Sequence, residues 1–143
     1  MNKEFIDYCK SLGLGAELLG RVQALHLMFV AMFPDVIKDI FIGDVIEPDG
    51  TRNYTGVTFF SQHFIGTANS FANNPSSFIW PDPSFSGFNF GVEDFAWTTA
   101  TEKSRLVFRC FTLPGLASLE LRASGQNCLK LVKIIKDWLM RAR

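Results

Sequence analysis

The sequence predicts a single α+β domain, in which two N-terminal helices precede a strongly bent antiparallel sheet, or partly open barrel, of about seven strands. Three observations lead to this fold class. Apolar residues recur at three- and four-residue steps through residues 3–33, alternate at a period of two from Val36 onward, and return to helical spacing at the end of the chain. This last segment predicts an amphipathic helix that closes the sheet or barrel. The domain 1–143 therefore divides into a helical extension, 1–35, and a sheet with its closing helix, 36–143.

The N-terminal segment predicts two helices separated by a glycine break. Phe5, Tyr8, Cys9 and Leu12 mark the first helix, and Gly13 and Gly15 follow it. The second helix carries its apolar row at Leu18, Val22, Leu25, Phe29 and Met32. Further apolar residues widen this arc, so we expect helix 16–33 either to cover the open side of the barrel or to form a dimer contact. His26, on the same helix, is expected to be a core histidine whose polar atoms are satisfied.

The next segment predicts three strands. Ile37–Ile46 is rich in β-branched residues, and the Asp49-Gly50 pair after it is a strong signal for a hairpin turn. We expect the second strand at 53–60 and the third at 63–71. With Asp49 and Gly50 at the centre of the turn, the predicted cross-strand pairs are Ile46 with Asn53, Ile42 with Val57, and Ile40 with Phe59.

Residues 72–87 predict an irregular loop. The segment contains three prolines, which disfavour a regular strand or helix. It also carries Phe78, Ile79 and Trp80, so it either packs onto the domain or touches a partner. The aromatic tip of this loop is one candidate binding surface.

Further strands are predicted at 88–90, 92–101 and 105–112, with a turn at 102–104. Pro114 and Gly115 suit the centre of the turn that follows. This turn sets Arg109 opposite Glu120 and Phe108 opposite Leu121, and the charged pair is reasonable cross-strand chemistry.

The last helix has the clearest pattern in the sequence. Its apolar stripe consists of Cys128, Leu131, Val132, Ile135, Trp138 and Leu139. Lys130, Lys133 and Arg141 belong to the opposite, basic face, which is the second candidate binding surface. Together with the loop at Phe78–Trp80, it would suit a weak contact with an anionic membrane.

This order of elements resembles the pleckstrin-homology-like superfold, and within it the GRAM-type and small bacterial domains. The resemblance rests on the strands Gly56–Phe60 and His63–Thr67, on Leu106–Phe108 with Leu119–Leu121, and on the closing helix that ends in Asp137–Leu139. It covers roughly residues 36–139. It implies a binding or scaffolding module of a fold that hosts several kinds of partner.

The first hairpin loop departs from the phosphoinositide-binding members of that family. Those members place Lys and Arg in this loop, whereas Glu47–Arg52 has one basic residue and two acids. The usual inositol-phosphate site is therefore expected to be absent. A helix-grip, START-like fold is the alternative architecture, because 15 Phe residues would suit an apolar cavity between a sheet and the last helix.

Composition excludes several functional classes. Lys+Arg and Asp+Glu number 14 each, which argues against a nucleic-acid binder. Residues 1–100 carry 5 basic and 11 acidic side chains and residues 101–143 carry 9 and 3, a pattern that favours internal complementarity. Three widely spaced cysteines and two histidines predict no metal site or cofactor, and a reduced, cytoplasmic protein.

Signals of catalysis are weak. Ser61 and His63 lie two residues apart, and Glu93 and Asp94 follow later, but no G-x-S-x-G nucleophile turn is present. We expect a non-catalytic binding or scaffolding module whose partner is another protein or a second copy of the chain. The alternative is a domain that binds an apolar small molecule or lipid.

Overall fold

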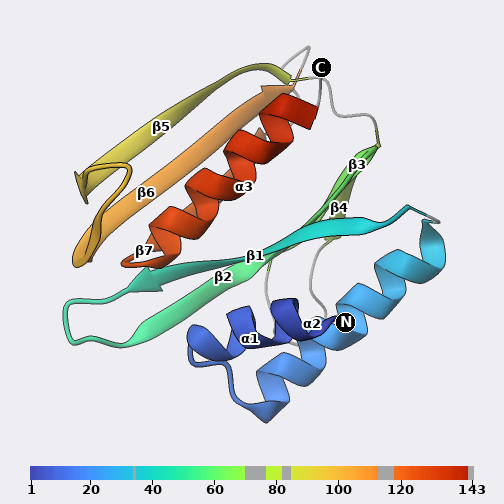
Figure 1. Cartoon of the computed structure of the whole chain (residues 1–143), viewed down its shortest axis with the longest axis horizontal. Coiled ribbons are helices and arrows are strands. Elements are labelled where there is room, and N and C mark those ends of the chain that lie inside the picture. Colours follow the sequence, from blue (N-terminus) through green and yellow to red (C-terminus); the bar gives the residue numbers. More distant parts are fainter. Residues whose placement is uncertain (34, 70–76, 82–84, 113–117, 142–143) are drawn as a thin grey trace.

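The computed structural model describes residues 1–33, 35–69, 77–81, 85–112 and 118–141. Helices and strands alternate in blocks along the chain (Figure 1). In order, the elements are α1 (Lys3–Ser11), α2 (Ala16–Met32), β1 (Ile37–Ile46), β2 (Arg52–Ser61), β3 (Phe64–Ala68), β4 (Ser77–Pro81), β5 (Phe85–Phe95), β6 (Ala100–Thr112), β7 (Ser118–Ser124) and α3 (Asn127–Arg141).

The strands form two separate antiparallel sheets (Figure 1). One sheet has the order β1-β2-β3-β4, and the other has the order β5-β6-β7. The prediction of a single bent sheet, or partly open barrel, of about seven strands is therefore wrong. The helix-grip alternative, in which one long sheet wraps a helix, is wrong for the same reason. Within the described residues the protein is α+β, and its sheets do not close into a barrel.

Side chains connect the two sheets where β1 approaches β7. The Asp44 carboxylate accepts a hydrogen bond from the Ser124 N–H at 3.0 Å. The Ser124 hydroxyl accepts from the Ile46 N–H at 3.2 Å and donates to the Asp44 carbonyl at 3.3 Å. These bonds occupy the N–H groups of Ser124 and Ile46 and the carbonyl of Asp44, which a continuous hydrogen-bond ladder between β1 and β7 would use. The two strands therefore belong to different sheets.

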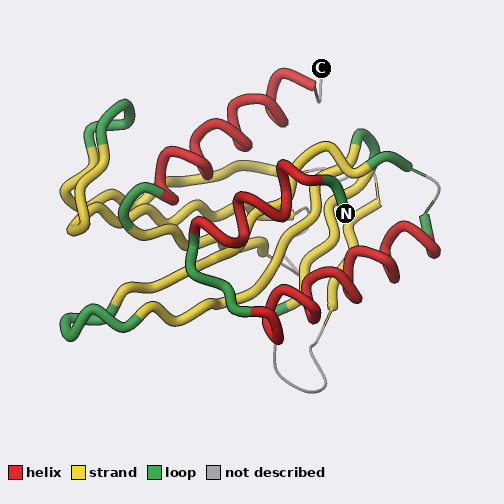
Figure 2. The backbone as a smooth tube through the Cα atoms, turned by 60° about the horizontal axis from the view of Figure 1, so that its bottom comes forward, coloured by secondary structure: helices red, strands yellow, loops and turns green. Residues whose placement is uncertain are grey.

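The helices cover the sheets from different sides (Figures 1 and 2). One core lies between α1, α2 and the four-stranded sheet, and the other joins α3 to the three-stranded sheet. The four-stranded sheet contributes to both. Ile40, Ile42 and Phe59 belong to the first core, whereas Phe41 and Phe60 belong to the second, as the alternation of side chains along a strand requires.

The inner face of α2 packs closely on β3. Gly66 leaves the space that the ring of Phe29 occupies, and a Cβ at this position would overlap that ring. Phe29 also contacts Phe59, with ring centroids 5.1 Å apart. The His26 ring lies 5.8 Å from Phe59, but its buried Nδ1 has no hydrogen-bond partner. The expectation that His26 is satisfied is therefore wrong.

The predicted cross-strand registers are largely confirmed. Opposite pairs form between Ile42 and Val57 and between Ile40 and Phe59, as the hairpin predicts. Ile46 faces Arg52 instead of Asn53, because an irregularity between Gly43 and Asp44 shifts the register by one residue. In the second sheet, the predicted pairs Arg109 with Glu120 and Phe108 with Leu121 both form.

The prediction of an irregular loop over 72–87 is wrong in part. Ser77–Pro81 forms β4, and β5 already begins at Phe85. Pro81 is the last residue of β4, at the outer edge of its sheet, where a missing N–H costs little. The turn predicted at 102–104 lies instead between β5 and β6, where Trp97 adopts a left-handed backbone with φ 69°.

The three predicted helices are confirmed within one to three residues at their ends. No helix in the described part of the chain has the length and apolar character needed to cross a membrane.

Candidate functional site

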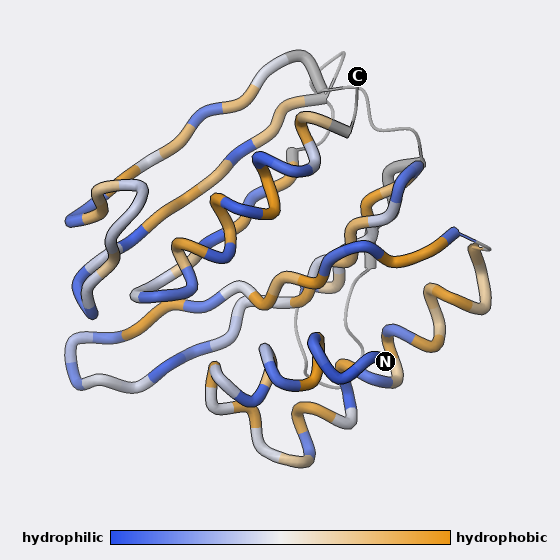
Figure 3. The backbone as a smooth tube through the Cα atoms, in the orientation of Figure 1, coloured by the Kyte–Doolittle hydropathy of each residue, from blue (hydrophilic) through white to orange (hydrophobic). Residues whose placement is uncertain are grey.

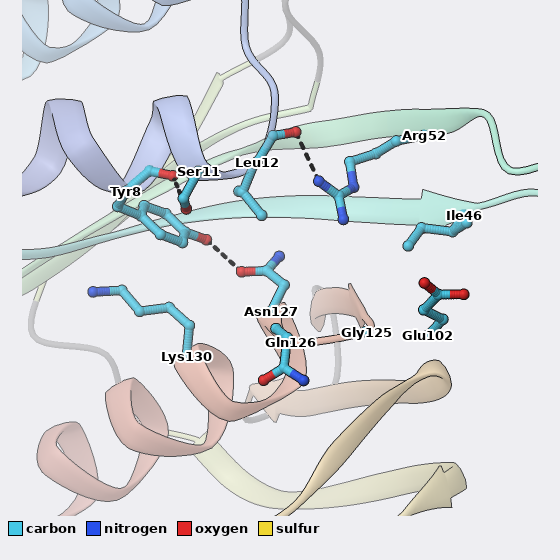
Figure 4. Close-up of a pocket in the computed structure, with 10 residues that line it drawn as sticks. All are labelled: Tyr8, Ser11, Leu12, Ile46, Arg52, Glu102, Gly125, Gln126, Asn127 and Lys130. Carbon is cyan, nitrogen blue, oxygen red and sulfur yellow. Dashed lines mark hydrogen bonds between the residues drawn. The ribbon is translucent and has the colours of Figure 1, made fainter.

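A pocket of about 390 Å³ lies between α1, the β1–β2 hairpin and the start of α3, and most of the side chains that line it are polar (Figure 4). Tyr8 and Lys130 lie at one end of the pocket, and Arg52 and Glu102 lie at the other. A pocket of this size is at the small end of the range for small-molecule sites.

Asp44 lies behind this pocket and holds its wall together. The carboxylate is fully buried, and its Oδ1 accepts from the Ser124 N–H at 3.0 Å and from Asn127 Nδ2 at 2.8 Å. Its Oδ2 lies 3.2 Å from Arg52 Nε, an ion-pair distance, although neither atom completes an aligned hydrogen bond. Burial raises the pKa of Asp44, against the lowering effect of Asn127, Ser124 and the two nearby arginines.

Tyr8 connects α1 to the same cluster. Its hydroxyl donates to Asn127 Oδ1 at 2.7 Å and accepts from the Ile42 N–H at 3.0 Å. Burial raises the pKa of the Tyr8 phenol well above its ordinary value, so the side chain stays neutral. Lys130 lies over the ring, with Nζ 4.8 Å from the ring centroid, in a cation–π contact.

Arg52 fixes the end of α1. Its Nη1 donates to the Leu12 carbonyl at 2.8 Å, and the Tyr54 hydroxyl donates to the same carbonyl at 2.6 Å. Arg52 and Asp44 together therefore bind α1, β1 and β2 to the segment that starts α3.

The side chains of this pocket hydrogen-bond to one another and to the backbone. The Ser11 hydroxyl at its edge donates to the Tyr8 carbonyl at 2.6 Å. Burial raises the pKa of Cys9 and Cys128 to about 11 and that of Cys110 to about 12, so the thiols are poor nucleophiles.

Ser61 and His63 meet at the β2–β3 turn. The buried Ser61 hydroxyl accepts from the Phe64 N–H at 2.9 Å and donates to the Phe64 carbonyl at 3.0 Å. His63 Nδ1 lies 3.2 Å from Asp35 Oδ2, so its carboxylate neighbour is not one of the acids considered from the sequence. Among the described residues, no group of three potential metal ligands lies together.

The sequence-predicted binding residues fall in different layers. Phe78, Ile79 and Trp80 lie on β4 and pair with β3, at the edge of the four-stranded sheet. Their side chains lie outside the described part of the structure. Lys130 and Lys133 lie on α3, which covers the other sheet. Lys133 is exposed, whereas Lys130 is half-buried against Tyr8; Arg141 ends α3 and its side chain is outside the description.

A second candidate surface lies on β5. Phe88, Phe90 and Val92 pair with Cys110, Phe108 and Leu106 of β6, so they share the face that α3 covers. Their partners are buried, but these three side chains remain 45%, 40% and 41% exposed. Figure 1 shows why: α3 crosses β6 and β7 and leaves β5 beyond it.

The sequence alone did not identify the pocket in front of Asp44 or the apolar row on β5, although each leaves a signal in the sequence. Asp44 is a carboxylate in the second half of β1, where every other residue from Ile40 to Ile46 is apolar or glycine, which is an unusual place for a charge. Phe88, Phe90 and Val92 alternate as a half-buried strand should. Only the position of α3 decides that this row stays uncovered.

The chain matches no protein-family model and no curated protein sequence. Among solved structures, it is similar to the crystal structure of the C-terminal domain of an unknown protein from Leishmania infantum. The two have a TM-score of 0.52 and 8% sequence identity, over 82% of this chain and 96% of that chain. At this identity the similarity concerns the fold alone.

Proposed function

We propose that this chain is a non-catalytic protein-binding module that docks an extended segment of a partner protein along β5. The exposed apolar row Phe88, Phe90 and Val92 carries this proposal, because it continues a core face and yet none of the described helices covers it. Trp97 adds an aromatic side chain, 43% exposed, with its ring 5.3 Å from that of Phe90.

The backbone of β5 supports the same conclusion. β5 lies at the open edge of its sheet, where unpaired N–H and C=O groups can pair with an added strand. Edge strands are commonly protected by charged residues, Pro or β-bulges, and in β5 the charges Glu93 and Asp94 and the two irregularities lie toward its ends, which leaves the stretch 87–92 without any of them. A segment with apolar side chains at alternate positions would pair with this edge and extend the apolar row.

The packing favours this function over an apolar cavity. Phe108, Leu131 and Trp138 fill the space between α3 and its sheet, where a helix-grip cavity would lie. The membrane alternative requires Phe78–Trp80 beside the basic face of α3, and these elements belong to different layers. Cys9, Cys110 and Cys128 are free thiols and all are buried, which supports a reducing compartment. We therefore place the module in the cytoplasm.

A peptide selection tests the proposal. A library of random peptides displayed on phage is selected against the wild type, and the binders are compared on Phe90→Lys and Asn89→Lys. Both variants place the same charge on β5, but on opposite faces. We expect peptides with alternating apolar residues that bind Phe90→Lys at least tenfold more weakly and bind Asn89→Lys nearly as well as wild type. Binders that ignore both substitutions, with both variants folded by circular dichroism, would contradict the proposal.

A further inference from the structure

The face of α2 that points away from the sheet is apolar and uncharged. From Val22 to Phe33 the chain contains no Asp, Glu, Lys or Arg. Leu27 is 67% exposed and Met32 is 59% exposed, and Val30 and Met28 are exposed beside them. A helix on the surface of a globular protein ordinarily turns charged or polar residues to solvent.

The described part of the chain leaves this face uncovered. Val22 and Phe29, on the opposite side of the helix, are fully buried against the four-stranded sheet. The helix therefore has a complete inner face, and the exposed row is a second apolar surface. Within the described residues, no element lies over it (Figure 2).

We infer that this outer face of α2 packs against the same face of a second copy of the chain, forming a two-fold α2–α2 dimer. Leu27, Met28, Val30 and Met32, which are 67%, 38%, 45% and 59% exposed, together expose on the order of 400 Å² per copy. A symmetric pair that covered these side chains would bury about 800 Å², the size of a weak, reversible contact. We expect a dissociation constant in the micromolar range.

Charge favours a copy of the same chain as the occupant. The charged residues of α2 are Glu17 and Arg21, which pair with each other at 2.8 Å near the start of the helix. Helices that cross near Leu27 and Ala31 would place the Glu17–Arg21 pair, at the start of α2, away from the contact. An uncharged patch is self-complementary under a two-fold axis.

The same residues disfavour a lipid surface. Helices that lie in a membrane interface carry Lys and Arg along their polar face. α2 has one basic residue, Arg21, and Glu17 already pairs with it. The inference is independent of the proposed docking at β5, because the two surfaces lie on different sheets.

Sedimentation equilibrium of the full chain tests the dimer. We expect the wild type to move from 16.1 kDa toward twice that mass between low and high micromolar concentration. Leu27→Lys should weaken the dimer at least tenfold. The matched control is Met140→Lys, which replaces a 73% exposed apolar residue on the other covering helix and should change nothing. Circular dichroism checks that both variants are folded.

A cysteine variant tests the geometry. Ala31→Cys should form an intermolecular disulfide under mild oxidation, whereas Lys133→Cys should not, and the native thiols are buried. A wild type that stays monomeric at the highest concentration would overturn the inference. A dimer that survives Leu27→Lys would also overturn the inference, because the contact would then lie elsewhere. A dimer that Val92→Lys abolishes would overturn it too and would place the contact at β5.

Discussion

The helices α2 and α3 each pack an apolar row against a sheet, and they differ on the face that points away from it. The outer side of α3 presents Lys133, Lys136 and Asp137 to solvent, and its hydropathy alternates along the helix (Figure 3). The outer side of α2 presents Leu27, Val30 and Met32. Each inner face packs on its sheet, so the two helices differ in the outer face, which in α2 is apolar and uncovered by the described part of the chain.

The two helices also begin differently. Asn127, the first residue of α3, donates to Asp44 Oδ1 and to the Ile42 carbonyl, each at 2.8 Å. α2 begins after Gly15, with no side-chain hydrogen bond at its N-cap. Polar contacts therefore help to position the start of α3, whereas the start of α2 has no such side-chain cap. The predictions below test this contrast.

The largest expected effect is on the inner faces. Phe29→Ala should destabilise the fold by about 3–5 kcal/mol and Leu131→Ala by about 2–5 kcal/mol, because each leaves a cavity at a fully buried site. Urea denaturation measures both. A cost below about 1 kcal/mol for Phe29→Ala would mean that α2 does not pack on the sheet as described.

The next effect concerns the polar start of α3. Asp44→Ala should cost about 3 kcal/mol, because it leaves Arg52, Asn127 and the Ser124 N–H without their shared acceptor. We place it at the lower end of the usual range because the Arg52 side chain is 29% exposed. Asp44→Asn keeps one acceptor oxygen and should cost less than half as much. Equal losses for the two variants, by the same denaturation measurement, would show that hydrogen bonding at this site is unimportant.

The smallest effect is a pH dependence carried by α2. Burial lowers the pKa of His26 below its ordinary value of 6.5. The unfolded chain therefore binds more protons, so the contribution of His26 is complete above pH 6.5 and is lost as the pH falls below it. His26→Leu should flatten the decline in stability between pH 7 and pH 5, measured by thermal melts across that range. The control is His63→Asn, on the exposed turn, which should leave the contribution of His26 in place. If stability falls with pH as steeply in His26→Leu as in the wild type, the pH dependence does not come from His26.

Local chemistry made much of the fold predictable. The turn residues Asp49 and Gly50 set the pairing of Ile42 with Val57, and the stripe from Cys128 to Leu139 predicted α3 almost to its ends. These features depend on neighbours a few residues away along the chain, so periodicity and turn preference reveal them. The irregularity beside Asp44 was not predictable, because it depends on Ser124, 80 residues later.

The candidate surfaces required the tertiary structure. The sequence shows that Phe88, Phe90 and Val92 alternate and that helix 16–33 is apolar over a broad arc. Whether such side chains are covered depends on where α3 lies across its sheet and on which side of α2 meets β3. Likewise, the split into two sheets follows from where Asp44 and Ser124 meet. The sequence by itself determined which segments are helix or strand and which faces are apolar, since these follow from local geometry. Only the three-dimensional packing decided which of those faces remain exposed, because coverage depends on contacts between residues far apart in the chain.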